Sequence, residues 1–107
     1  MSQQQKTRRQ TLEEVVGSNP DNAFARYGLA MECVNAGEDE AAREHFCKLL
    51  LMQPDYLAAY YHYGLLLKKI GHTKEALEIL RAGIPVARKA GNEHARSELE
   101  AALAELS

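Results

Sequence analysis

The sequence predicts an all-α protein built from paired antiparallel helices, and three observations support this prediction. First, the helix-favouring residues Ala, Leu, Glu and Lys dominate the chain. Second, the stretch from Pro54-Asp55 to Gly71 opens with a helix-starting pair, continues with aromatics and leucines, and closes with a helix-stopping glycine. Third, a weaker copy from Pro20-Asp21 to Gly37 precedes it by 34 residues, a period typical of helical repeat proteins.

The composition limits the classes of function. A chain of 107 residues is long enough for one domain. A net charge of -2 argues against a dedicated nucleic-acid binder. No apolar run is long enough to cross a bilayer, and no signal peptide follows Met1. We therefore expect a cytoplasmic protein with no membrane association, in which Cys33 and Cys47 are reduced thiols with buried or half-buried side chains.

The first predicted helix spans residues 6–16 and is ended by Gly17. Its basic residues Lys6, Arg8 and Arg9 lie at the helix N-terminus, where positive charge opposes the helix dipole. Its first turn is therefore expected to be loose. This basic cluster could also contact an acidic partner, although three charges are too few to indicate nucleic acid.

Five further helices are predicted from start and stop signals. They lie within residues 22–36, 39–52, 54–71, 73–90 and 93–106. The expected N-caps are Asp21 or Asn22, then Asp39, Thr73 and Asn92. Pro85 falls inside the apolar stripe of the fifth helix. Because that stripe stays in phase beyond the proline, we expect a bend at Pro85 rather than the end of the helix.

The repeated positions resemble the signature of the tetratricopeptide repeat (TPR) family. A shift of 34 residues places Pro20 on Pro54 and Tyr27 on Tyr61. The second unit has signature residues at Tyr60, Gly64, Leu67, Ala76, Leu80 and Gly83. The first unit has them at Leu29, Ala30, Cys33, Ala42, Phe46, Leu49 and Pro54.

This resemblance implies a right-handed α-α superhelix, a TPR-like solenoid of about six antiparallel helices with a C-terminal capping helix. The whole chain, 1–107, would form a single domain. Its parts would be an N-terminal half-repeat helix at 6–19, repeats at 20–53 and 54–91, and a capping helix at 92–107. The second repeat would have an extended second helix.

Three positions depart from the family pattern. Arg26 stands at the place of the first unit's aromatic residue, and Tyr63 replaces the second unit's leucine. Arg88 stands where the second unit's closing proline is expected. The fifth helix is therefore expected to continue to Ala90 before the final helix folds back.

In TPR proteins the first helices of successive units line a concave groove that holds a peptide or a helix of a partner protein. The resemblance places ten residues of this chain in such a groove. They are Phe24, Tyr27, Met31, Val34, Ala58, Tyr61, His62, Leu65, Lys68 and Lys69. The alternative is that these side chains only pack under the neighbouring helices of a short solenoid.

The chemistry of these residues indicates the kind of partner. The TPR subclass that clamps a C-terminal carboxylate uses Lys and Asn, which Tyr27, Met31, Tyr61 and Leu65 do not provide. The groove is instead apolar and aromatic, with two lysines at one end. It would suit an amphipathic helix or an extended apolar peptide with some acidic residues. No cofactor is implied.

Two other classes of function remain as alternatives. Self-association into a homodimer would use the same surface or the N-terminal half-repeat, where Leu12, Val15 and Val16 lack a partner helix. An enzyme or a metal site would depend on the four histidines. No pair of them has the i, i+4 spacing of a helical zinc site, and no nucleophile-base arrangement is evident. A non-catalytic protein-interaction module is therefore the preferred interpretation.

Overall fold

The computed structural model describes residues 5–107, and these residues contain six α-helices and no strand. The predicted all-α class with six helices is confirmed. The chain forms two compact units that are divided between Met52 and Gln53. The helices of the first unit are α1 (Arg8–Ser18), α2 (Ala23–Asn35) and α3 (Asp39–Met52). Those of the second unit are α4 (Leu57–Lys69), α5 (Thr73–Ala90) and α6 (Glu93–Leu106).

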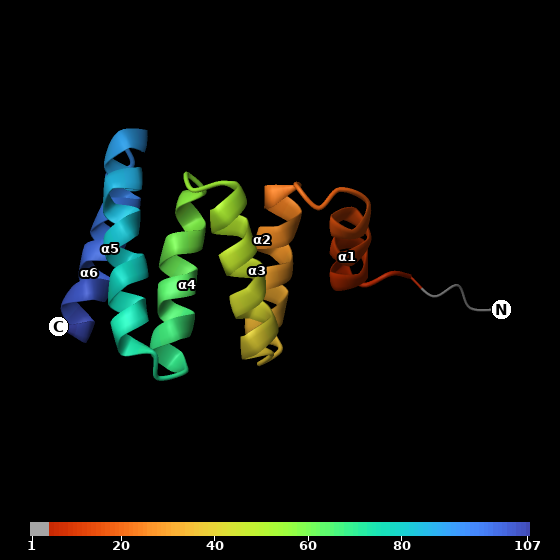
Figure 1. Cartoon of the computed structure of the whole chain (residues 1–107), viewed down its shortest axis with the longest axis horizontal. Helices are drawn as coiled ribbons and strands as arrows, with labels where there is room; N and C mark the ends of the chain where they lie inside the picture. Colours follow the sequence, from red (N-terminus) through yellow and green to blue (C-terminus); the bar gives the residue numbers. More distant parts are fainter. Residues whose placement is uncertain (1–4) are drawn as a thin grey trace. The chain divides into compact units, whose positions relative to one another are not determined.

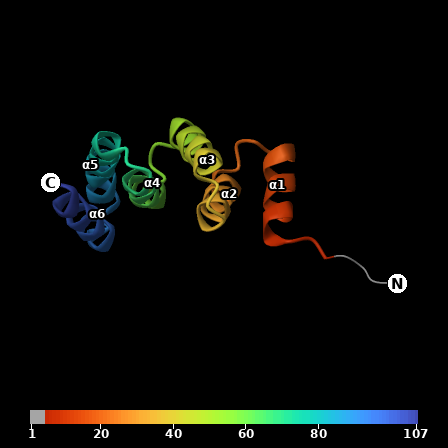
Figure 2. The ribbon, with the colours of Figure 1, turned by 90° about the horizontal axis from the view of Figure 1, so that it is seen from below.

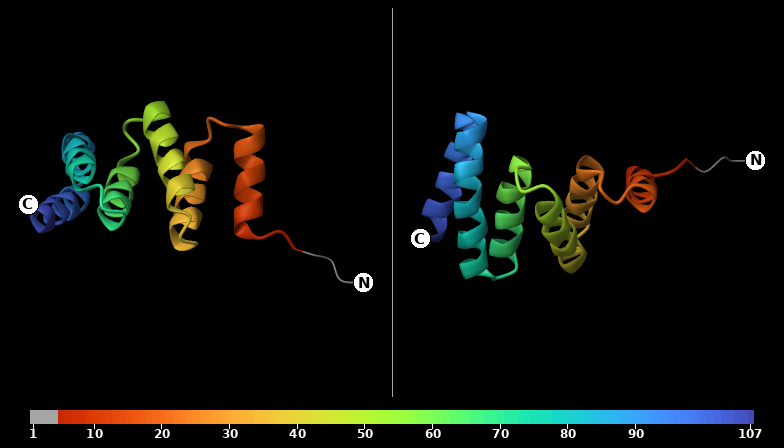
Figure 3. Two further views of the ribbon diagram at one scale, coloured as in Figure 1. Left: turned by 60° about the horizontal axis from the view of Figure 1, so that its bottom comes forward. Right: turned by 45° about the horizontal axis from the view of Figure 1, so that its top comes forward.

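In the first unit, α2 and α3 form an antiparallel pair, and α1 packs against α2 (Figures 1 and 3). The α2/α3 pair supplies the core, because a helix with so many apolar positions can bury them on two sides. The largest fully buried side chains of this core are Phe46, Leu49 and Cys33. Helix α1 has no buried residue of its own, but its Leu12 side chain lies directly against Gly28 of α2.

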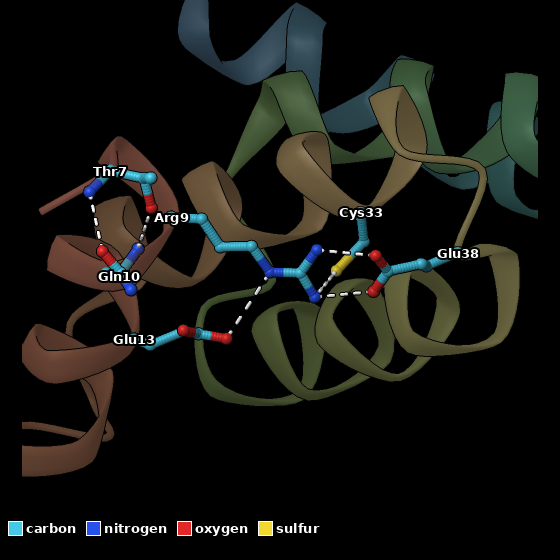
Figure 4. Close-up of polar contacts among 6 residues, drawn as sticks. All are labelled: Thr7, Arg9, Gln10, Glu13, Cys33 and Glu38. Carbon is cyan, nitrogen blue, oxygen red and sulfur yellow. Dashed lines mark hydrogen bonds and ion pairs between the residues drawn. The ribbon is translucent and has the colours of Figure 1, made fainter.

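The first turn of α1 is capped, which differs from the loose turn expected from its basic residues. Thr7 is the N-cap, and its hydroxyl accepts a hydrogen bond from the Gln10 backbone at 3.1 Å. The Gln10 side chain accepts one in return from the Thr7 backbone at 2.8 Å (Figure 4). This capping box satisfies two backbone donors that the start of a helix leaves without partners.

Arg9 attaches α1 to the rest of the first unit. Its guanidinium donates two hydrogen bonds to Glu38, at 2.7 and 2.6 Å, and also lies 3.8 Å from the Cys33 sulfur (Figure 4). Glu13 is a further partner at 3.5 Å. The hydrogen bonds from Arg9 lower the pKa of the Glu38 carboxyl, whereas burial raises the pKa of the Cys33 thiol. The basic cluster therefore contributes to internal structure.

In the second unit the three helices each contact the other two, as the end-on view in Figure 2 shows. Helices α4 and α5 approach closely because Gly64 has no side chain: a Cβ atom there would lie 2.4 Å from Leu80. Gly83 has the same role on α5, where a Cβ atom would lie 2.7 Å from Tyr60 and 3.0 Å from Leu99 of α6. Small residues on one helix of this unit thus pack closely against large residues on the next.

Each unit contains an equivalent hydrogen bond from a side chain to a backbone carbonyl, but the donor residue differs between the units. In the second unit, the Tyr60 hydroxyl donates to the Pro54 carbonyl at 2.5 Å. In the first unit, Arg26 stands at the equivalent position and donates through Nη2 to the Pro20 carbonyl at 3.2 Å. Arg26 is only 7% exposed and also contacts Nδ1 of His45 at 3.3 Å. The arginine therefore substitutes chemically for the family's aromatic residue.

The predicted helix ends are partly confirmed. Asn22 and Asn92 are N-caps whose side chains accept from Ala25 and Ala95, and Gly91 ends α5 in the left-handed conformation with φ of 67°. Asp39 and Thr73 were predicted as caps, but they are the first residues of their helices.

Gly17 does not stop α1, which continues to Ser18 because glycine is tolerated within a helix. Pro85 lies inside a continuous α5, and the bend expected there stays a prediction.

Candidate functional site

A cleft lies between α4 and α6 in the second unit, with a volume of about 440 Å3. The α4 wall consists of Leu57, Ala58, Tyr61 and His62, and the α6 wall of Asn92, His94, Ala95, Glu98 and Leu99. On each helix these positions recur three and four residues apart, so they share one face. The cleft is therefore a product of two helix faces that α5 holds beside each other.

The size of the side chains explains why the two faces leave a cleft. Ala58 and Ala95 are short and lie on opposite walls, while the fully buried Leu99 contributes an apolar base. Tyr61 and His62 stand next to each other with ring centroids 5.3 Å apart in an edge-to-face arrangement. This geometry is favourable for aromatic pairs and fixes the two rings as one wall of the cleft.

The polar groups of the cleft are the Tyr61 hydroxyl, two histidines, Asn92 and one carboxylate. Burial lowers the pKa of His62, and the nearby Glu98 opposes that shift. His94 lies with Nε2 3.6 Å from the Glu98 carboxylate. Within residues 5–107, no group of three or more His, Cys, Asp or Glu side chains converges as a metal site would require. The arrangement offers apolar surface and hydrogen-bonding groups, which suits binding.

The six predicted groove residues on α4 are not equivalent in the structure. Ala58, Tyr61 and His62 line the cleft, whereas Leu65 is half-buried and is not one of the lining residues. Lys68 and Lys69 are exposed at the C-terminal end of α4. Lys68 forms an ion pair with Glu105 of α6 at 3.2 Å.

The four predicted groove residues on α2 belong to the first unit. Phe24 is 65% exposed. Tyr27, Met31 and Val34 are half-buried along the same helix. The helix thus presents an apolar surface, and the role of these four residues in partner binding stays a prediction.

The α6 wall was not predicted from the sequence, because the last helix was expected to serve only as a cap. A signal was present, since one further shift of 34 residues carries Ala58 onto Asn92, Tyr61 onto Ala95 and Leu65 onto Leu99. Helix α6 therefore occupies the position that the first helix of a third repeat would have. The same shift places the signature residues Tyr60 and Gly64 on the polar residues His94 and Glu98, which hid the relationship.

The remaining predicted features also have clear positions. Each residue of the basic cluster has a carboxylate partner within the first unit: Lys6 pairs with Glu14, Arg8 with Glu32 and Arg9 with Glu38.

Cys33 is buried as expected, but Cys47 is exposed, because it points away from the core side of α3 where its neighbour Phe46 is buried. No helix within residues 5–107 has the length and apolar character needed to span a bilayer.

Comparison with known proteins decides the family. A profile of the tetratricopeptide repeat matches residues 57–89. The solution structure of a tetratricopeptide repeat domain protein from Salinibacter ruber is 34% identical, covers 82% of this chain and 89% of that one, and superimposes with a TM-score of 0.77. The chain belongs to the tetratricopeptide repeat family.

Two further comparisons extend over most of the chain. A TPR repeat-containing protein of Pseudomonas aeruginosa is 28% identical over 95 residues, which are 89% of this chain and 90% of that protein. A protein from Bordetella parapertussis has the same fold, with a TM-score of 0.81 at 24% identity over 95% of this chain and 89% of that one. TPR membership favours a protein-interaction module, as the sequence signature implied.

Proposed function

We propose that this TPR chain is a non-catalytic interaction module whose α4/α6 cleft receives a segment of a partner protein. The observation that carries the proposal is the cleft itself, with the paired rings of Tyr61 and His62 facing the short side chain of Ala95. Its volume of about 440 Å3 lies within the range of binding sites that accept organic ligands or side chains. In the first unit, the exposed Phe24 of α2 is a separate candidate for contact with a partner protein.

The cleft can be blocked without disturbing the core. Ala58 lines the cleft but its side chain is exposed, so an arginine there would fill the space while reaching solvent. Ala82 on α5 is equally exposed and lies outside the cleft, which makes Ala82→Arg the matched control. Both variants add the same charge and volume to a helix surface.

The test begins with a selection of short random peptides on the wild-type chain by display. Selected peptides should bind Ala58→Arg at least about tenfold more weakly, since the loss of one well-packed contact site costs more than about 1.4 kcal/mol. Their affinity for Ala82→Arg should be unchanged. Equal affinity for the wild type and Ala58→Arg would show that the cleft is not the binding site, and a selection that enriches no peptide would contradict the proposal.

Self-association is a second candidate function, favoured by one observation on α1. Leu12, Val15 and Val16 are each only half-buried, and α1 has no fully buried residue. A second copy of the chain could cover this face, because an isologous contact buries the same residues twice. Light scattering would support this function if the molar mass doubled with rising concentration, and a constant monomer mass would argue against it.

A further inference from the structure

We infer that the segment recognised by the α4/α6 cleft carries a basic side chain, Arg or Lys, whose aliphatic stem lies between Ala58 and Ala95 and whose charged end reaches Glu98. This inference rests on the proposed function and adds the chemistry of the partner. It differs from the expectation from sequence, which was an amphipathic helix or an extended apolar peptide with some acidic residues near Lys68 and Lys69. The distribution of charge between α4 and α6 carries the argument.

The carboxylates of α6 differ in whether they already form an ion pair with a cation of the same chain. Arg96 binds Glu93 at 2.6 Å and Glu100 at 2.5 Å. Glu105 is occupied by Lys68 of α4. Three of the helix's negative charges are thus offset by cations of the same unit.

Glu98 is the exception among these carboxylates. Its one ionic contact among the described residues is to Nε2 of His94 at 3.6 Å, longer than a good hydrogen bond. Its side chain is 42% exposed, so a cation from another molecule can reach it. It is also the one Asp, Glu, Lys or Arg residue among those that line the cleft.

The two histidines near Glu98 do not supply the permanent positive charge that an Arg or Lys of the partner would. His62 reaches the cleft from α4, and its burial lowers its pKa, so the ring is neutral at neutral pH. His94 lies on the same helix as Glu98 with a side chain that is 86% exposed. None of the cleft-lining residues comes from α5, and none of them is a lysine or an arginine.

The rest of the cleft fits the stem of a long basic side chain. Ala58 and Ala95 leave space for a methylene chain, and burial of such stems beside apolar surface is favourable. The ring of Tyr61 on the same wall can interact with the cation through its face. Arginine fits best, because its planar guanidinium can bind a carboxylate through two hydrogen bonds and also stack on an aromatic ring.

The decisive experiment compares peptide selections on the wild type, Glu98→Gln and Glu98→Lys. Glu98→Gln keeps the shape and removes the charge, while Glu98→Lys reverses it. Glu78→Lys is the matched control, because Glu78 is exposed on α5 and lies outside the cleft. The probes are the same display library of short random peptides and synthetic copies of its enriched sequences.

Peptides selected on the wild type should be enriched in Arg or Lys at one position next to an apolar residue. They should bind Glu98→Gln about tenfold or more weakly, since charge-assisted hydrogen bonds are the strong ones, and their affinity should fall as salt rises. Glu98→Lys should select acidic residues at that position, whereas Glu78→Lys should select the same basic peptides as the wild type.

The outcomes separate this inference from the proposed function. Peptides that lose affinity for Ala58→Arg but show no excess of basic residues, or that bind Glu98→Gln as tightly as the wild type, would overturn the basic partner and leave the cleft as the binding site. A selection that enriches no peptide on the wild type would overturn both.

Discussion

Arg26 makes a hydrogen bond to the backbone that a tyrosine makes in the second unit. It reaches the Pro20 carbonyl, as Tyr60 reaches the Pro54 carbonyl in the second unit, and so keeps the turn before α2 attached to the helix. The guanidinium brings more donors than this turn can use. Its Nε is buried and has no hydrogen-bond partner among the described residues, which is a cost that a tyrosine would avoid.

Replacing Arg26 tests this interpretation. Arg26→Tyr should keep the bond to Pro20 and remove the unsatisfied donor, so its free energy of unfolding should equal or exceed that of the wild type. Arg26→Ala loses the bond and leaves a cavity, and should lower the free energy of unfolding by roughly 2 kcal/mol. Urea denaturation measures both.

The control for this series is Arg81→Ala, which removes one exposed arginine of α5 and should change stability by less than about 0.5 kcal/mol. If Arg26→Tyr were as unstable as Arg26→Ala, the hydrogen bond to Pro20 would not be the contact that matters, and the bond to His45 would take its place as the explanation.

At the scale of helices, the second unit depends on a close approach that its glycines permit. Gly64 of α4 lies against Leu80 of α5, which is fully buried. The equivalent residue in the first unit is Ala30, which is fully buried. The two helix pairs therefore tolerate different side chains at the same repeat position.

Gly64→Ala should destabilise the protein by about 1–3 kcal/mol, because the added methyl group overpacks the α4/α5 interface. Gly17→Ala is the matched control: it lies inside α1 with nothing within 4 Å of the added Cβ atom. This change should stabilise α1 by roughly 0.5–1 kcal/mol through helix propensity. Both can be measured by thermal unfolding, and a neutral Gly64→Ala would show that Leu80 can shift.

The helices were predictable because their signals are local. Apolar periodicity, Asn caps and glycine stops lie within a few residues of the ends that they specify, and the repeat confirmed their order. The α6 wall of the cleft was not predicted, because Asn92 and Glu98 acquire their role only when α6 folds beside α4. The ion pair between Lys68 and Glu105 joins residues distant in sequence, and periodicity carries no information on such pairs.

At the scale of the whole molecule, two histidines make the free energy of unfolding depend on pH. His45 in the first unit and His62 in the second both have lowered pKa values, in each case first because burial opposes the charged ring. Arg26 and Lys48 add to the shift at His45. Since the unfolded chain accepts a proton at the ordinary pKa of about 6.5 and the folded chain accepts it only at a lower pH, acidification favours unfolding.

Stability should therefore fall as the pH drops from about 7.5 to about 5.5, a range in which the histidines dominate the change. The carboxylates Glu38 and Glu93 have lowered pKa values because Arg9 and Arg96 bind them, so their contribution is lost only below the ordinary value of about 4.3. The fall in melting temperature should be modest, because both histidine rings are partly exposed to solvent.

The double variant His45→Gln, His62→Gln should show a smaller loss of melting temperature over this range than the wild type. His94→Gln is the control for the loss of one histidine, because the His94 side chain is 86% exposed. An equal loss in the wild type and the double variant would assign the pH dependence to other groups.

The positions of the tyrosines give the protein a built-in optical label. The chain has five tyrosines and no tryptophan. All but Tyr27 lie between Tyr56 and Tyr63, at the start of the second unit. Tyrosine fluorescence therefore reports mainly on that unit, while far-ultraviolet circular dichroism records the helices of both. If the two signals change at the same denaturant concentration, the units unfold as one, and separate midpoints would measure their individual stabilities without any added probe.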